Sequence, residues 1–136
     1  MSPAGSILAQ IATQGWRDPV TGRRVAALPD DLQGVLQQAW GGFDPSDPAW
    51  SSARFVVGCG LLALGQPEVL VAVLASLPPE PLPARRAFLP ALRRLIPFPP
   101  GADPASDLAS ALRWAARATL RFDADLGVYG VVEGPA

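Results

Sequence analysis

The sequence predicts a mainly α-helical domain of about six helices, stacked as antiparallel hairpins with minor β structure. Its composition, 49% hydrophobic and 17% charged over 136 residues, provides enough apolar surface for one core. A long apolar stretch runs from Arg54 to Leu77, and after Arg54 its only polar side chains are Gln66, Glu68 and Ser76. Gln66 divides the stretch into two helix-sized blocks, which the flanking segments must cover.

We expect a single domain over residues 1–136. Residues 1–28 are predicted to form an N-terminal helix and a hairpin. Residues 29–121 are predicted to form helical hairpins, and residues 122–136 a β-prone tail.

The N-terminal segment predicts a short helix followed by a β-hairpin. Ile7, Leu8 and Ile11 share one helix face between residues 2 and 14, and Gly15 ends this helix. The sequence DPVTG at 18–22 places Pro at the second turn position and ends on a Gly that can take positive φ. We therefore expect short hairpin arms near residues 16–17 and 23–27.

Three helices are predicted between residues 29 and 77. The first, 29–40, has Pro29 at its first helical position and stops at Gly41-Gly42. Its apolar face consists of Leu32, Val35, Leu36, Ala39 and Trp40. The second, 48–64, is capped by Ser46 or Asp47 and closed by Gly65. The third, 67–77, is apolar nearly all round, which favours a central position in the fold.

Two helices are predicted in the C-terminal half. The first, 83–96, contains Pro90, which removes a backbone donor and predicts a kink. Its inward residues are Phe88, Leu89, Leu92, Leu95 and Ile96. The second runs from Pro104 to about Arg121 with Asp103 as its cap, and its inner face is Leu108, Ala111, Leu112, Ala115 and Thr119. We expect the β-prone residues 128–132 to pair with the early hairpin.

A two-helix period is visible in the spacing of three prolines. Pro29, Pro67 and Pro104 each open a predicted helix, and they stand 38 and 37 residues apart. Behind the first two prolines the apolar positions coincide, Leu32 with Leu70, Val35 with Val73 and Leu36 with Leu74, whereas the third copy is shifted by one residue. Such a period is typical of helical solenoids.

The segment 63–95, ALGQPEVLVAVLASLPPEPLPARRAFLPALRRL, resembles the HEAT-repeat class, especially its short bacterial type. It has a Leu-Gly-x-Pro turn, an apolar second helix, an acidic-proline turn and an Arg pair at Arg85-Arg86. The resemblance implies a short solenoid that binds other proteins. The hairpin, the tail and the PFPPGADP loop depart from the pattern.

The absence of His excludes several kinds of catalytic and metal site. Without His there is no Ser-His-Asp or Cys-His catalysis and no His-ligated metal. The one cysteine, Cys59, lies between two glycines in the apolar stretch, which favours a buried structural thiol. Asp123 and Asp125 lack the further ligands of a calcium loop, so a turn is favoured there. We expect no cofactor, no metal and no catalytic residue.

Neither a membrane span nor a signal peptide is expected. Pro67 and Glu68 fall in the middle of the apolar stretch, where a charge in a bilayer is costly. The N-terminal residues lack a basic region followed by a long apolar one. We expect a bacterial, cytoplasmic protein.

Positive charge gathers in residues 82–122, which hold seven of the eleven Arg and only two Asp. Arg113, Arg117 and Arg121 recur every four residues and predict a stripe on the last helix. Arg86 and Arg93 share a face of the preceding helix, and adjacent helices could place the two sets side by side. Trp114 neighbours the stripe and is a candidate apolar anchor. The explanation that we favour for this pattern is the solvated face of two amphipathic helices. The other tryptophans, at 16, 40 and 50, are expected to pack in the core or at its edge.

These features favour a non-enzymatic interaction or adaptor module. Its partner would be another protein with an acidic surface or tail, and the exposed ends of a short solenoid would allow homo-oligomers. One alternative is a nucleic-acid-associated protein that uses the Arg-rich face, although the pI of about 5.2 disfavours it. A second alternative is an enzyme that uses carboxylates alone.

Overall fold

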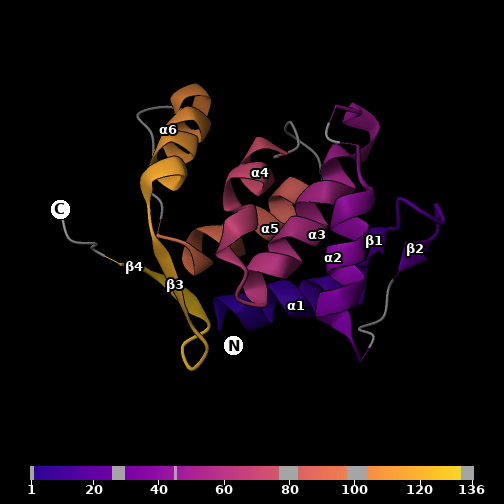
Figure 1. Ribbon diagram of the computed structural model, residues 1–136, viewed down its shortest axis with the longest axis horizontal. Coiled ribbons are helices and arrows are strands. Elements are labelled where there is room, and N and C mark those ends of the chain that lie inside the picture. The colour runs from indigo at the N-terminus through magenta and orange to yellow at the C-terminus, as the bar shows by residue number, and fades with distance from the viewer. Residues whose placement is uncertain (1, 26–29, 45, 77–82, 98–103, 133–136) are drawn as a thin grey trace.

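The computed structural model describes residues 2–25, 30–44, 46–76, 83–97 and 104–132, with the backbone alone for 83–87 and 104–110. The fold is mainly α-helical with two small β-hairpins, which confirms the predicted fold class (Figure 1). The α-helices are α1 (Pro3–Gln14), α2 (Leu32–Gly42), α3 (Ser51–Ala63), α4 (Leu70–Ala75), α5 (Pro83–Leu95) and α6 (Pro104–Arg117). Among the described helices, none combines the length and apolar character needed to cross a bilayer.

Helix α3 is the centre of the fold. It contacts α1, α2, α4 and α5, and every residue from Phe55 to Ala63 is buried. The segment 67–77, which was predicted to be central, has fewer helix neighbours than α3. Its described residues form a single 3-10 turn, η2 (Pro67–Val69), and the short helix α4, which packs between α3 and α6 and leaves Val71 43% exposed. Both segments are apolar, but only α3 is surrounded by other helices.

Two glycines of α3 allow its neighbours to approach closely. A Cβ atom on Gly58 would overlap Val73 of α4 and come within 2.9 Å of Cζ3 of Trp40 on α2. A Cβ atom on Gly60 would lie 2.7 Å from Cδ1 of Ile11 and 2.8 Å from Cδ1 of Leu36. Since real Cβ contacts are longer, α1, α2 and α4 pack against α3 at distances that a larger residue would prevent.

The N-terminal helix and hairpin are confirmed. Ser2 caps α1, with its Oγ accepting a hydrogen bond from the N–H of Gly5 at 3.0 Å. Gly15 ends the helix at φ 71°. Strands β1 (Trp16–Arg17) and β2 (Arg24–Val25) then pair antiparallel around the expected turn.

The predicted starts of the repeated helices are only partly confirmed. Helix α2 begins at Leu32 with Asp31 as its cap, three residues after Pro29, which lies outside the described residues. It also includes Gly41 and Gly42 in its last turn. Helix α4 begins at Leu70, the repeat equivalent of Leu32, so the spacing between these two helix starts is preserved. Helix α6 begins directly at Pro104.

Helices α3 and α5 follow their predictions closely. Asp47 caps the 3-10 turn η1 (Pro48–Trp50) that leads into α3, and Gly65 follows α3 at φ 89°. Helix α5 contains Pro90 at an exposed position. Its residues Phe88, Leu92 and Leu95, with Ile96 after it, are buried as predicted.

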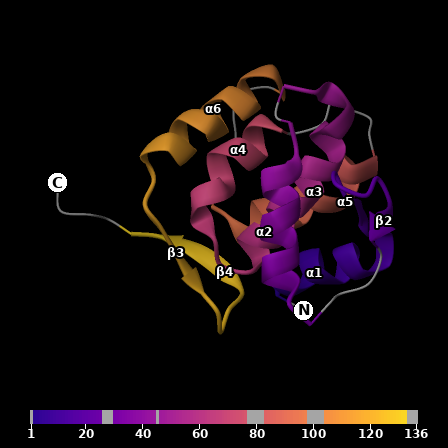
Figure 2. The same ribbon diagram turned by 45° about the vertical axis from the view of Figure 1, so that its right-hand side comes forward.

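The C-terminal segment differs from its prediction. Helix α6 ends at Arg117, four residues early, and Thr119 is therefore not on its inner face. Residues Leu120–Asp123 form β3, which pairs antiparallel with β4 (Val128–Val131). The expected pairing of the tail with the early hairpin was wrong, because the two hairpins are separate sheets at opposite ends of the molecule (Figures 1 and 2).

Some helix contacts join helices that are neighbours in the sequence, but one contact joins α1 to α5. Helix α3 packs on its sequence neighbours α2 and α4, as expected for stacked hairpins, and α6 packs on α4 (Figure 2). However, α1 contacts α5 as well as α3, so these three helices pack mutually. In an open solenoid each repeat contacts only its neighbours. The HEAT-like solenoid stays a prediction.

Candidate functional site

The predicted arginine surface is divided between two elements. Arg113 and Arg117 are exposed on α6, whereas Arg121 is exposed on β3, because the helix ends before it. The prediction of one helical stripe through all three residues was therefore wrong. Arg93 is exposed on α5, and the side chain of Arg86 lies outside the described residues. Helix α6 packs on α4, so the expected alignment of the α5 and α6 arginines does not follow from the helix contacts.

Trp114 is half-buried and packs against the core from α6. Trp16 is buried in β1, and Trp40 and Trp50 pack at the edge of the core, as predicted. The guanidinium of Arg54 lies 4.6 Å from the ring centre of Trp40, and that of Arg17 lies 4.8 Å from Trp50. These tryptophans therefore serve as packing surfaces for nearby arginines.

A groove of about 360 Å³ lies between the start of α4 and the end of α6. We call it the α4–α6 groove. Its lining consists of Pro67, Glu68, Leu70, Val71, Ala115, Ala118, Thr119 and Leu120. One wall carries exposed Val71 and Glu68, and the other is made of the small residues Ala115 and Ala118. Sequence reasoning missed this groove, because its two walls come from segments that are far apart in the sequence.

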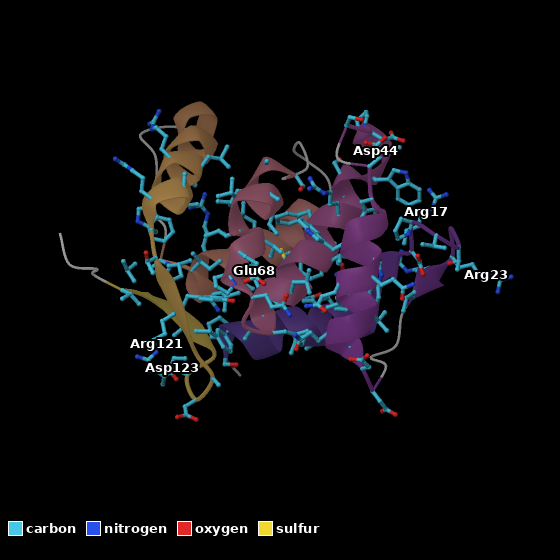
Figure 3. The ribbon with its side chains drawn as sticks, in the orientation of Figure 1. Arg17, Arg23, Asp44, Glu68, Arg121 and Asp123 are labelled. Carbon is cyan, nitrogen blue, oxygen red and sulfur yellow. The ribbon has the colours of Figure 1, made fainter. Side chains whose placement is uncertain are left out.

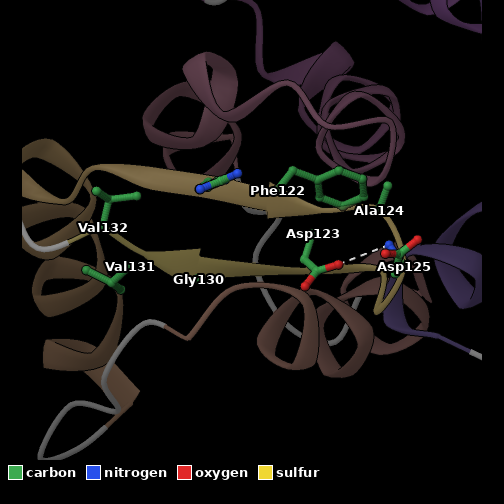
Figure 4. A pocket seen from close by; sticks show the side chains of 8 residues that line it. Phe122, Asp123, Ala124, Asp125, Gly130, Val131 and Val132 are labelled. Atoms are coloured by element: carbon green, nitrogen blue, oxygen red, sulfur yellow. Dashed lines mark hydrogen bonds between the residues drawn. The ribbon is translucent and has the colours of Figure 1, made fainter.

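The outer face of the β3–β4 hairpin forms a shallow depression of about 650 Å³ (Figure 4). Its floor lies at Gly130, which pairs with Arg121, and a Cβ atom there would meet nothing within 4 Å. Asp123 and Asp125 border the depression at the turn, and Val132 borders it at the other end (Figure 4).

The turn role predicted for Asp123 is confirmed. Its Oδ1 accepts hydrogen bonds from the N–H groups of Asp125 at 3.0 Å and Leu126 at 3.1 Å. Gly127 completes the turn at φ 66°, a conformation that favours glycine. The second carboxylate, Asp125, projects from an exposed position in the same turn.

The hairpin is held firmly on the core. The Tyr129 hydroxyl donates a buried hydrogen bond of 2.7 Å to the carbonyl of Leu62 in α3, and the ring packs 5.0 Å from that of Phe122. The N–H of Ala4 in α1 donates to the carbonyl of Gly127 at 3.1 Å. Burial, and then the nearby charge of Glu68, raises the pKa of Tyr129, so its hydroxyl keeps its proton and remains a donor.

Most of the strongly exposed large apolar side chains in the described residues lie on this side of the molecule. They are Val71 on α4, Leu126 in the turn, and Val131 and Val132 at the end of the hairpin, at 43%, 64%, 48% and 41% exposure. Val20, in the other hairpin, is the exception. We call the surface formed by α4, α6, β3 and β4 the C-terminal flank. Figure 3 shows Arg121 and Asp123 on this flank, at the opposite end from Arg17 and Arg23.

The other side chains that could take part in chemistry, Cys59 and Arg54, have structural roles. Cys59 is fully buried in α3, and burial raises the pKa of its thiol, which opposes formation of the reactive thiolate. Arg54 donates from Nη1 to Oγ of Ser76 at 3.0 Å and thereby joins α3 to the end of α4. Within the described part of the chain, no three metal-ligating side chains gather at one place.

The chain matches no protein-family model, no curated protein and no solved structure. The similarity to HEAT repeats stays a prediction.

Proposed function

We propose that this protein is a non-enzymatic interaction module that binds another protein through the α4–α6 groove. The observation that carries the proposal is the groove itself, which is lined by the exposed Val71 and by two small residues, Ala115 at the end of α6 and Ala118 just after it. Exposed apolar surface that is bordered by polar residues is typical of protein interaction sites. A volume of about 360 Å³ is at the lower end for ligand pockets and suits a few apolar side chains of a partner.

The charges on the two walls suggest the orientation and chemistry of the partner. Arg117 is exposed in the last turn of α6 and directly precedes Ala118 of the groove. Glu68 is exposed on the opposite wall. A partner segment with apolar residues in the groove and acidic residues toward α6 would match this pattern, whereas a reversed segment would place its acidic residues against Glu68.

The proposal is tested by blocking the groove with a charge. Val71→Asp places a carboxylate on its apolar wall at an already exposed position. Val20→Asp is the matched control, because Val20 is also exposed but lies in the other hairpin. A partner is first captured from the native cell and then purified. We expect its dissociation constant to rise about 10-fold or more with Val71→Asp, roughly 1.4 kcal/mol or more, and to stay unchanged with Val20→Asp.

Arg117→Glu is expected to slow association and to reduce its dependence on salt. Equal affinity of all three variants would remove the groove from consideration. Loss of the captured material after nuclease treatment would instead favour the nucleic-acid alternative, whose affinity falls steeply with salt.

A further inference from the structure

The outer face of the β3–β4 hairpin is complementary in charge to itself. Along this face the carboxylates Asp123 and Asp125 lie at the turn, and Arg121 lies nearer the open end. Cross-strand partners point to the same face, so Arg121 shares the outer face with Gly130, and Asp123 shares it with Val128. One surface thus carries a basic site and an acidic site, and the residue beside the basic site, Gly130, has no side chain.

A surface of this kind fits a second copy related by a two-fold axis. In such a pair the same patch is used twice, so a contact from residue i to residue j is repeated from j to i. An axis that passes between Arg121 and the turn would bring each Arg121 against the carboxylates of the other copy. Both charge pairs would form at once, and the open space over Gly130 would let the two hairpins approach.

Apolar surface and overall charge favour the same arrangement. Val132, two residues beyond Gly130 along the chain, lines the depression and is exposed, so it would lose contact with water on docking. The hydrogen bonds of Tyr129 and Ala4 already hold the hairpin in place, which lowers the entropy lost on association. The net charge of the chain is −1, so two copies repel each other weakly.

We infer that the protein forms a weak two-fold homodimer through the outer face of the β3–β4 hairpin, with Arg121 of each copy against Asp123 and Asp125 of the other. The hairpin face is small, and interfaces below the standard size are typically weak and reversible. This dimer uses a different surface from the α4–α6 groove and does not depend on the function proposed for that groove.

A charge exchange between two variants tests the inference. Arg121→Asp places like charges against each other in the homodimer. The double variant D123N/D125R does the same with positive charge, and its Asn keeps an oxygen that can accept the hydrogen bonds of the turn. Mixed in equal amounts, the two variants would restore both opposite-charge contacts. Arg23→Asp is the control, because it makes the same change of charge at an exposed position in the other hairpin.

Sedimentation velocity over about 10 μM to about 1 mM measures the dissociation constant of each protein. We expect the wild type and Arg23→Asp to have the same dissociation constant. Arg121→Asp alone and D123N/D125R alone should each have a dissociation constant at least about 10-fold higher, and the mixture of the two should return to within about 3-fold of the wild type. Circular dichroism of each variant confirms that its fold is intact. A wild type that stays monomeric over this concentration range would show that the hairpin face does not bind a second copy, and would overturn the inference. So would an Arg121→Asp protein that dimerises like Arg23→Asp, or a mixture that does not recover.

Discussion

Replacing Gly58 by alanine tests whether close packing around α3 organises the fold. A Cβ atom at this position overlaps Val73 and lies 2.9 Å from Trp40. Val73 is fully buried and β-branched, so its side chain has few alternative rotamers. The matched control is Gly41→Ala in α2, where a Cβ atom would meet nothing within 4 Å. The chemical change is the same at both positions, and only the surroundings differ.

The two substitutions are expected to have opposite signs. Replacing a helical Gly by Ala stabilises the folded state by about 0.5–1 kcal/mol, because the unfolded chain loses freedom. Gly41→Ala should show this gain alone. Gly58→Ala gains a similar amount but incurs overpacking of about 1–3 kcal/mol, and the stiff Val73 places it in the upper half of that range. The net result is a destabilisation of about 1–2.5 kcal/mol, below the 5–15 kcal/mol stability of a typical domain.

Urea unfolding followed by tryptophan fluorescence measures both changes. We expect a lower midpoint for Gly58→Ala and a slightly higher midpoint for Gly41→Ala, with equal slopes for both variants and the wild type. The reasoning fails if Gly58→Ala is as stable as Gly41→Ala, because α3 would then not be packed against α4 and α2 as closely as the structure has it.

Three further changes probe the caps and the hairpin anchor. Tyr129→Phe removes the hydrogen bond from the hydroxyl to the carbonyl of Leu62, which still accepts from the N–H of Gly65 at 3.1 Å, and should cost about 1 kcal/mol in urea unfolding. Because folding raises the pKa of this tyrosine, its contribution to the free energy of unfolding should be complete below about pH 10 and should decline as the pH rises further. The stabilities of the wild type and Tyr129→Phe should therefore converge in alkaline solution. A difference that stays constant with pH would argue against the anchor. Asp47→Ala removes the cap before α3 and should lower the unfolding free energy by about 1 kcal/mol, measured by chemical denaturation at neutral pH. Gly127→Ala forces a residue with a side chain into positive φ, which should destabilise the folded state by about 1–2 kcal/mol and lower the melting temperature. An unchanged thermal transition would contradict this prediction.

Local patterns predicted the helices well because their information lies in neighbouring residues. The face of α5 with Phe88, Leu92 and Leu95 follows directly from helical spacing, and each of these residues is buried. Likewise, Asp47 was predicted to be a cap from its residue type and position. The end of α6 could not be found in this way. The four-residue spacing of its arginines continues through Arg121, whereas the strand is stabilised by partners at 128–131.

The candidate site depends on contacts that no local pattern contains. The exposure of Arg113 and Arg117 follows from the amphipathic pattern of α6, and it was predicted. The α4–α6 groove, by contrast, exists because Val71 and Ala118 come together from distant parts of the chain. The sequence could not show which helix is central, for the same reason. Both apolar blocks could be central, and the choice depends on how α1 and α5 pack around α3.

The central position of α3 has a consequence for synthesis on the ribosome. Its last residue, Ala63, is made about 30 residues before Leu95 completes α5, which covers one of its sides. At a typical rate of about 5–20 residues per second, about 2–6 seconds pass between completion of the apolar helix α3 and completion of α5. Helices α1 and α2 are made before α3 and pack on it, so two of its sides can be covered before α5 is complete.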